Sequence, residues 1–357
     1  MATAITHDRS TSHLPHLKSI VHDLFTPSPQ IYWLDFLGSI LIGWGAFSFT
    51  VYMKFSWISI LTFLIASLAL YRAVIFVHEL THLKKGTFRW FHIVWNLLCG
   101  FPLLVPSFLY MSVHLDHHKL KYYGTKDDKE YAPFALENPT KILKFISLMF
   151  LAPILFIIRF LVATPLSYLI PSLRKPLWEF ASSLAVGSGY QRPLASLEQQ
   201  HIWWIQEFLT FAYAITAVLL VIFHILPFKV LILWYCTATM ILLLNAIRTL
   251  AAHRYLNPPN RSLNFIQQFL DSVNIPGGAL TSLWAPVGLR FHATHHLFSN
   301  MPYHQLRKAH ERLTQKLPKD HFYFQANQKS LWSALNQLWT TAIANQKVQE
   351  NSKTKIL

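Results

Sequence analysis

Three short histidine clusters are the residues of this sequence best suited to chemistry. Each spaces its histidines three or four positions apart, so the imidazoles share one face if the segment is helical. Eight imidazoles are too many for one tetrahedral or octahedral ion, and the pattern therefore predicts two metal ions held by neutral imidazole. The clusters are His78-Glu79-Leu80-Thr81-His82 (cluster 1), His114-Leu115-Asp116-His117-His118 (cluster 2) and His292-Ala293-Thr294-His295-His296 (cluster 3).

The composition predicts that these clusters are positioned by membrane-spanning helices. The chain has 357 residues, of which 53% are hydrophobic and 13% are charged, whereas soluble proteins average about 25% charged residues. Four segments reach the length of about 20 apolar residues that crosses a bilayer as a helix. They form two predicted hairpins, Trp33–Tyr52 with Phe55–Val77 and Ile202–Ile225 with Val230–Ala252.

Two further apolar stretches, Phe91–Val113 and Leu143–Ile170, contain prolines and are predicted not to cross. A single crossing by either stretch would place two histidine clusters on opposite sides of the membrane, which a shared metal site forbids. They are expected to lie in the interface or to dip in and return. The predicted fold is an all-α integral membrane protein with four transmembrane helices in two hairpins, interfacial or re-entrant helices, and a cytoplasmic helical cap at the metal site.

The net charge of +15 predicts which side of the membrane carries the clusters. Most lysines and arginines fall on the side of the histidines, so that side and both termini are predicted to be cytoplasmic. No signal peptide is visible. A basic surface can attract anionic lipid or an acidic protein, or it can be a topology signal alone. Nucleic acid is not expected as a partner of a chain with four spans.

Three regions are predicted from the change in character along the chain. Residues 1–30 form a polar, loosely ordered N-terminal arm, residues 31–317 form the membrane domain with the clusters, and residues 318–357 form a C-terminal amphipathic helix and tail. Amphipathic helices are expected through His304–Leu317 and again around Leu331, Leu335 and Leu338. The two cysteines, Cys99 and Cys236, are not expected to form a disulfide.

Three residues near the clusters have predicted roles in metal binding. His253 follows the last predicted span, at the expected membrane depth of His78, and is a candidate ninth ligand. Glu79 and Asp116 lie beside candidate ligands, where carboxylates often orient the second nitrogen of a ligating imidazole.

An iron pair would give these histidines redox chemistry, which zinc lacks. Iron ions with open positions can bind O₂ and, given two electrons, oxidise an unactivated C–H bond. No CxxCH haem motif and no GxGxxG dinucleotide motif occurs in the sequence. The electrons are therefore expected from a separate carrier protein, and the substrate is expected to be a lipid in the membrane.

At these residues the chain resembles the membrane fatty acid desaturase superfamily, whose bacterial members are histidine-box di-iron oxidases. The family pattern HxxxH, HxxHH, HxxHH is present in order, and the resemblance covers roughly residues 33 to 317. Matching stretches also lie at Tyr123–Tyr131, Arg248–Tyr255 and His295–His304. In some members an asparagine stands four positions before the residue that matches His253, and here Thr249 occupies that position.

The resemblance implies two iron ions with O₂ as co-substrate, and O₂-dependent desaturation of a fatty acyl lipid. Relatives hydroxylate or ketolate a carbon of a lipid or carotenoid instead, and this alternative stays open. The implied electron donor is a ferredoxin-like or cytochrome b5-like carrier, and the implied location is a bacterial inner membrane. His304 and His310 are interpreted as packing groups or as groups that support the ligands, and not as ligands. The implied iron ligands are His78, His82, His114, His117, His118, His253, His292, His295 and His296.

Two other classes of protein, an intramembrane zinc protease and a metal transporter, fit the sequence less well. Cluster 1 also reads as HExxH, the zinc-protease motif in which the glutamate is the general base, but a protease with one zinc does not need clusters 2 and 3. A metal transporter would need polar groups deep in its spans, whereas these histidines lie at span ends.

The predicted topology can be tested with single cysteines after both native cysteines are replaced. Lys54→Cys and Lys229→Cys, in the two hairpin turns, should react with a membrane-impermeant thiol reagent in intact cells. Asp127→Cys and Lys308→Cys, on the side of the clusters, should react only after permeabilisation. Labelling of Asp127→Cys from outside would separate cluster 2 from cluster 3 and contradict a shared metal site.

Overall fold

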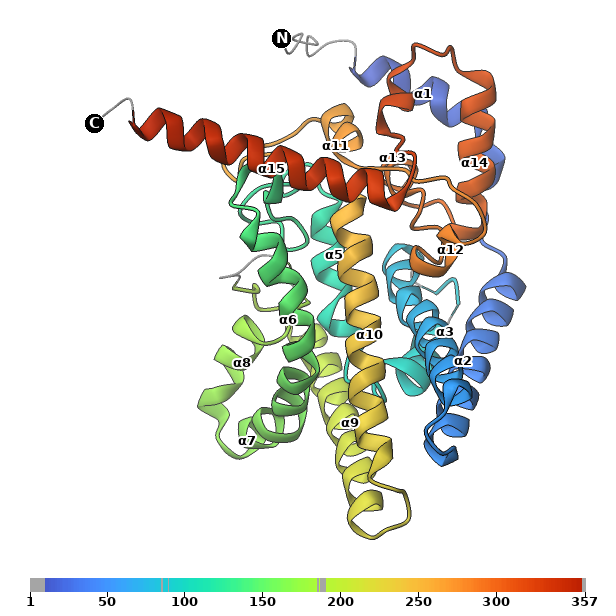
Figure 1. The fold of residues 1–357 in the computed structure, drawn as a ribbon, viewed down its shortest axis with the longest axis vertical. Coiled ribbons are helices and arrows are strands. Elements are labelled where there is room, and N and C mark those ends of the chain that lie inside the picture. Colours follow the sequence, from blue (N-terminus) through green and yellow to red (C-terminus); the bar gives the residue numbers. More distant parts are fainter. Residues whose placement is uncertain (1–9, 85, 89, 185, 187–190, 355–357) are drawn as a thin grey trace. The chain divides into compact units, whose positions relative to one another are not determined.

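The computed structural model describes residues 10–84, 86–88, 90–184, 186 and 191–354 (Figure 1). These described residues form helices, with isolated bridges in place of strands. The chain divides into two compact units. The membrane unit contains Pro29–Asp116 and Thr140–Ile247, and the terminal unit contains Met1–Ser28, His117–Pro139 and Arg248–Leu357.

The membrane unit is built from long apolar helices joined by shorter helical pieces. Two helices, α5 and α10, begin in this unit and continue for a few residues into the terminal unit. In chain order its elements are α2 (Pro29–Tyr52), α3 (Trp57–His82), α4 (Phe91–Trp95), η2 (Asn96–Gly100), η3 (Ser107–Leu109), α5 (Met111–His117), α6 (Thr140–Ile157), η5 (Ile158–Ala163), α7 (Thr164–Leu169), η6 (Pro171–Leu173), α8 (Arg174–Phe180), α9 (Leu197–Ile222) and α10 (Lys229–Ala252).

Among the described residues, five helical segments are long and apolar enough to cross a membrane. Four match the predicted spans. The fifth, Thr140–Leu169, was predicted not to cross, and by length and composition it qualifies. Its prolines do not end the helical run, because Pro153 is tolerated inside α6 and Pro165 falls in the first turn of α7, where no backbone N–H is needed.

After α7 the chain turns back toward the start of cluster 2. The guanidinium of Arg192 donates to the backbone oxygen of Phe108 at 2.7 Å and to the hydroxyl of Ser112. The backbone N–H of Leu184 also donates to the oxygen of Leu109 at 3.0 Å. Since Ser112 lies in α5, two residues before His114, this return course anchors the helix that carries cluster 2.

A buried ion network holds α9 against the segment from α6 to α8. Glu207 is fully buried and its carboxylate accepts hydrogen bonds from Arg159, from Arg174 at 2.6 Å and from the indole of Trp178. Arg159 also donates to Thr164, Ser182 and a backbone oxygen. Charges in apolar surroundings persist when they are paired and fully hydrogen-bonded, which explains an arginine inside a candidate span.

The two predicted hairpins are present, and their turns lie at the same end of the membrane unit. Helices α2 and α3 pack side by side, and a short turn connects α9 to α10 (Figure 1). The ammonium of Lys229, at the start of α10, donates to the backbone oxygens of Thr50 and Met53 at 2.8 and 2.5 Å. His78 and His82 lie at the opposite end of α3.

The irregular stretch between α4 and α5 survives in apolar surroundings because side chains satisfy its backbone. Asn96 accepts from the N–H of Ser107 and donates to its hydroxyl, while Gln206 accepts from the N–H of Phe108. Indole N–H groups of Trp44 and Trp234 donate to the oxygens of Leu98 and Pro102. Such internal satisfaction is required where water is absent. The stretch leaves cluster 1 and returns to it at His114, in agreement with the predicted re-entrant course.

The terminal unit contains His117 and His118 of cluster 2 and the whole of cluster 3. These residues are held among shorter helices. Cluster 3 forms the single short helix α13. The elements of this unit are α1 (Ser10–Ile20), η1 (His22–Leu24), η4 (Phe134–Leu136), α11 (Phe265–Asp271), α12 (Thr281–Trp284), α13 (His292–Leu297), α14 (Tyr303–Lys316), η7 (Phe322–Ala326) and α15 (Leu331–Thr354).

The prediction of a loosely ordered N-terminal arm was wrong for residues 10–24, whereas residues 1–9 lie outside the described part of the chain. Leu17 and Ile20 of helix α1 are buried in one apolar core with Leu306 and Leu313 of α14. The apolar residues of this polar segment lie on one face of the helix. Their burial orders the segment in spite of its polar composition. The predicted amphipathic helix through His304–Leu317 is confirmed as α14.

A polar chain supports α13 from within the terminal unit. The imidazole Nδ1 of His310 lies 2.8 Å from the hydroxyl of Tyr323, which lies 2.7 Å from the hydroxyl of Thr294 in cluster 3. The side-chain oxygen of Asn274 accepts from the N–H of Thr294 at 3.0 Å. His310 is buried, as predicted for a packing group, and burial lowers its pKa from 6.5 to about 4.

The lowered pKa of His310 predicts loss of stability in mild acid. Because the unfolded chain binds a proton at His310 below about pH 6.5 and the folded chain does not until about pH 4, stability falls as pH drops through this window. The limiting contribution is roughly 3 kcal/mol. The fall in melting temperature between pH 7 and pH 5 should be smaller in His310→Gln than in the unsubstituted protein; an equal fall would show that His310 does not contribute.

Candidate metal centre

Clusters 1 and 2 bring three imidazoles together inside the membrane unit. His78 and His82 lie one turn apart at the end of α3, and His114 lies in α5. The ring centroid of His114 is 4.5 Å from that of His78 and 5.0 Å from that of His82. The hydroxyl of Tyr110 lies 3.0 Å from Nδ1 of His114, which leaves the opposite nitrogen of that ring available to a metal.

A second group of four imidazoles lies entirely within the terminal unit. It consists of His117 from α5, His253 directly after α10, and His292 and His296 from α13, all of them buried. One nitrogen from each ring lies within 4.8 Å of the others. The Nε2 atom of His292 is 2.9 Å from Nε2 of His253 and 3.1 Å from Nε2 of His296. Sequence reasoning had predicted all four, and the fold brings them together.

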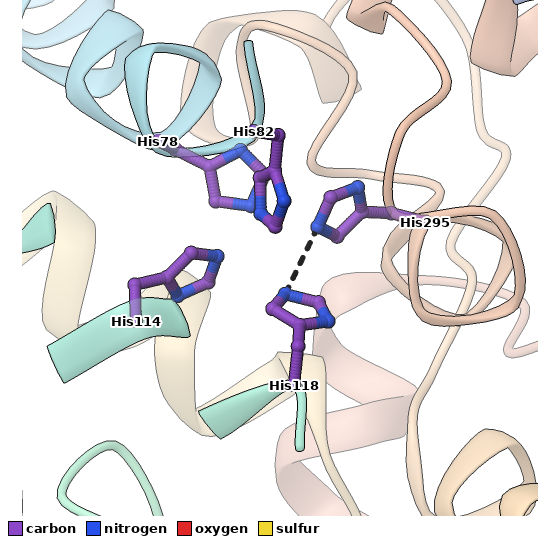
Figure 2. A group of neighbouring side chains, drawn as sticks. All are labelled: His78, His82, His114, His118 and His295. Atoms are coloured by element: carbon purple, nitrogen blue, oxygen red, sulfur yellow. Dashed lines mark hydrogen bonds between the residues drawn. The ribbon is translucent and has the colours of Figure 1, made fainter. Parts of the chain in front are cut away.

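The two remaining predicted ligands, His118 and His295, also lie in the terminal unit, with their Nε2 atoms 3.1 Å apart. Figure 2 shows this pair joined by a dashed line, together with the three imidazoles from α3 and α5. His295 is fully buried, whereas His118 is half-buried.

The protonation of three members of the four-histidine group suits metal binding. Burial, followed by the neighbouring imidazoles, holds the pKa of His253, His292 and His296 well below the ordinary value, so these rings are neutral. Burial also lowers the pKa of His117, but the carboxylate of Asp128 more than offsets this effect and the net shift is upward.

The same group leaves ring nitrogens that the protein alone does not satisfy. Three Nε2 atoms face one another, and Nδ1 of His292 is buried without a hydrogen-bond partner among the described residues. Burying neutral polar atoms without partners is costly. Lone pairs directed toward a common point are the donor set that a divalent transition metal requires, so these residues fit such an ion.

Residues that the sequence analysis did not single out hold the outer nitrogens of these rings. The carboxylate of Asp128 lies 2.9 Å from Nδ1 of His117 and accepts from the N–H groups of Gly124 and Glu130. The amide of Gln268 lies 3.2 Å from Nδ1 of His296. Such partners fix the tautomer and orientation of a ligating imidazole. The stretch Tyr123–Tyr131 was noted for its resemblance to the family, and that resemblance was the available signal for Asp128.

Glu79 is placed where an orienting role was predicted. Its buried carboxylate accepts from the hydroxyl of Tyr32 at 2.5 Å and lies 3.4 Å from Nδ1 of His78. Asp116 is half-buried, and its predicted role stays a prediction. His304 accepts from the backbone N–H of Ser28 at 3.2 Å, as expected of a packing group. Cys99 and Cys236 are both free thiols, as predicted.

Substitutions at Glu79 and His117 should separate an orienting residue from a ligand. Because Glu79 contacts a candidate ligand without being one, Glu79→Gln should lower metal retention or rate by roughly 10–100-fold. His117→Ala removes a donor nitrogen and should cost more. Bound metal is measured by elemental analysis of purified protein, alongside the rate. Inactive Glu79→Gln beside active His117→Ala would favour a protease with Glu79 as its base.

Comparisons with known proteins agree with this site. The fatty acid desaturase family profile matches residues 55–327, a range that includes all nine candidate ligands. A ceramide hydroxylase of Caulobacter vibrioides is 36% identical over 322 residues, which cover 90% of this chain and 91% of that protein. No solved structure matches the chain. The chain is an integral membrane protein and belongs to the fatty acid desaturase family.

Proposed function

We propose that this protein is an O₂-dependent di-iron oxidase that hydroxylates a ceramide-type membrane lipid. The observation that carries the proposal is the buried set of three neutral imidazoles, His253, His292 and His296, whose Nε2 atoms face one another. The similar ceramide hydroxylase, which the chain matches over nearly its whole length, supports the substrate class. The reaction balances as R–H with O₂, two electrons and two protons giving R–OH and water.

The proposed ligands divide into two sets. One ion is assigned to His117, His253, His292 and His296, whose donor atoms lie within the terminal unit. The other five histidines, His78, His82, His114, His118 and His295, are proposed as iron ligands from their places in the histidine pattern of the family. Within the membrane unit His78, His82 and His114 lie together, and within the terminal unit His118 and His295 lie together.

Bound iron would supply the activation of O₂, a chemistry that no side chain provides. The protein's own contribution is to keep the imidazoles neutral, to fix their outer nitrogens and to exclude water. Seven of the nine candidate rings are buried, which favours their neutral form and excludes water. Asp128 fixes the outer nitrogen, Nδ1, of His117.

Desaturation is the second candidate, and the family description favours it. It uses the same iron, O₂ and electrons, but removes two hydrogens from neighbouring carbons and yields two waters. The ligand set is common to both reactions. The similar ceramide hydroxylase therefore moves our preference from desaturation, which the sequence analysis had favoured, to the hydroxylation it had left open.

The electrons are proposed to come from an external carrier of the ferredoxin or cytochrome b5 type, on the cytoplasmic side of a bacterial inner membrane. The larger number of lysines and arginines on the side of the clusters supports this orientation, and the net charge of +15 supports an acidic carrier.

Expression in a host that contains ceramide should reveal the reaction. Lipid mass spectrometry should detect ceramide heavier by one oxygen atom, formed only with O₂, and with ¹⁸O₂ the label should enter the product. His292→Ala is the matched control and should form no product. A product lighter by two hydrogen atoms would identify desaturation, and unchanged lipids with intact protein and carrier would contradict both reactions.

A further inference from the structure

Asp271, at the end of α11, collects hydrogen bonds from two buried tyrosines. Its Oδ2 accepts from the hydroxyl of Tyr123 at 2.9 Å, and its Oδ1 accepts from the hydroxyl of Tyr131 and the N–H of Leu256, each at 3.2 Å. Three donors converge on one carboxylate, and Asp271 is only 6% exposed. The carboxylate is therefore the final acceptor of this network.

The network determines the direction of each hydrogen bond. Tyr131 accepts from the N–H of Asn257 at 3.0 Å and gives its own hydrogen to Asp271. Tyr123 likewise gives its single hydrogen to Asp271, and its oxygen lies 2.8 Å from Nδ1 of His253. Since Tyr123 has no second hydrogen, the hydrogen in this last contact comes from Nδ1 of His253.

The tautomer of His253 follows from this count of hydrogens. A neutral imidazole that carries its hydrogen on Nδ1 has its lone pair on Nε2. The Nε2 atom of His253 lies 2.9 Å from Nε2 of His292, on the side where the four donor nitrogens gather. The ring is thus fixed with its lone pair toward the proposed ion.

We propose that Tyr123 and Asp271 form a relay that positions His253 for metal binding, with Tyr123 as the obligatory link. The proposal rests on metal binding at the proposed site and adds two positioning residues to it. The link is needed because Oδ2 of Asp271 is 3.8 Å from Nδ1 of His253, beyond hydrogen-bonding distance. Ser272 is a poor substitute, since its hydroxyl is 3.4 Å from Nδ1 and donates to the oxygen of Gln268.

The backbone around Tyr123 is shaped to hold the relay. Gly124 has a φ of +68°, and a Cβ atom there would lie 2.9 Å from the side-chain nitrogen of Asn257. That nitrogen donates to the backbone oxygen of Gly124 at 3.0 Å. The same short segment contains Asp128, which holds His117. One loop therefore controls the outer nitrogens of two candidate ligands of the same ion.

The relay is tested by metal retention in Tyr123→Phe and Asp271→Asn. Phenylalanine keeps the ring and removes the acceptor for the Nδ1–H of His253. The affinity of the four-histidine site for iron(II) should therefore fall roughly 10–100-fold, as measured by competition with a chelator. Tyr255→Phe is the matched control. Tyr255 is also buried beside His253, with ring centroids 5.5 Å apart, but its hydroxyl donates to the backbone oxygen of Thr249, so iron retention should not change.

Two further measurements separate positioning from a general loss of structure. The double variant should lose no more affinity than the more affected single variant, because both residues act through one contact. The melting temperature of metal-free protein should be lowered no more by Tyr123→Phe than by Tyr255→Phe, whereas the stabilisation by added iron(II) should shrink only in Tyr123→Phe.

Unchanged iron retention in Tyr123→Phe, or losses that multiply in the double variant, would overturn the relay. These outcomes are distinct from failure of the proposed function. Product analysis of the unsubstituted protein tests the reaction, and metal retention of the variants tests the relay.

Discussion

The burial of many neutral imidazoles in one apolar protein is the constraint on which the rest of the structure depends. A neutral imidazole has one donor nitrogen and one acceptor nitrogen, and both need partners when water is excluded. Around the four-histidine group, Asp128, Gln268 and Tyr123 occupy the outer nitrogens of His117, His296 and His253. The inner nitrogens then face one another, an arrangement that a divalent metal ion fits.

The second constraint is that polar groups between the clusters lie in apolar surroundings. Asn96 and Gln206 stabilise the irregular stretch before α5, where they replace the water that would solvate its backbone elsewhere. That stretch returns the chain to the end of α3, where His114 meets His78 and His82. Glu207 pairs with two arginines of the helical segment from α6 to α8 and so holds α9 against it.

The chemistry of the family follows from combining these two constraints. A C–H bond of a lipid is unreactive, so its oxidation requires a redox-active metal shielded from water beside the membrane. Hydroxylation and desaturation share that requirement and differ in how the C–H bonds are positioned against the oxidant. The histidines therefore indicate an oxidase of lipid, while likeness to a ceramide hydroxylase supports the particular reaction and substrate proposed for this chain.

The sequence by itself determined the candidate ligands, the four spans of the two hairpins and the amphipathic helix α14. These features depend on local spacing: histidines three or four positions apart, apolar runs of sufficient length, and leucines on one helical face. Sequence reasoning did not count Leu143–Ile170 as a span, although the helical run Thr140–Leu169 has the length and composition of one, and it interpreted the polar composition of the N-terminal arm as loose order.

Only the tertiary structure decided which residues support the ligands, because those contacts join distant parts of the chain. Tyr123 and Asp271 are 148 positions apart, yet both lie within one network at His253. The carboxylates beside ligands in sequence, Glu79 and Asp116, were the candidates that local spacing could offer. The supporting roles of Asp128 and Asp271 can be recognised only in the folded structure. A buried carboxylate needs hydrogen-bond donors, and which donors reach it depends on the whole fold.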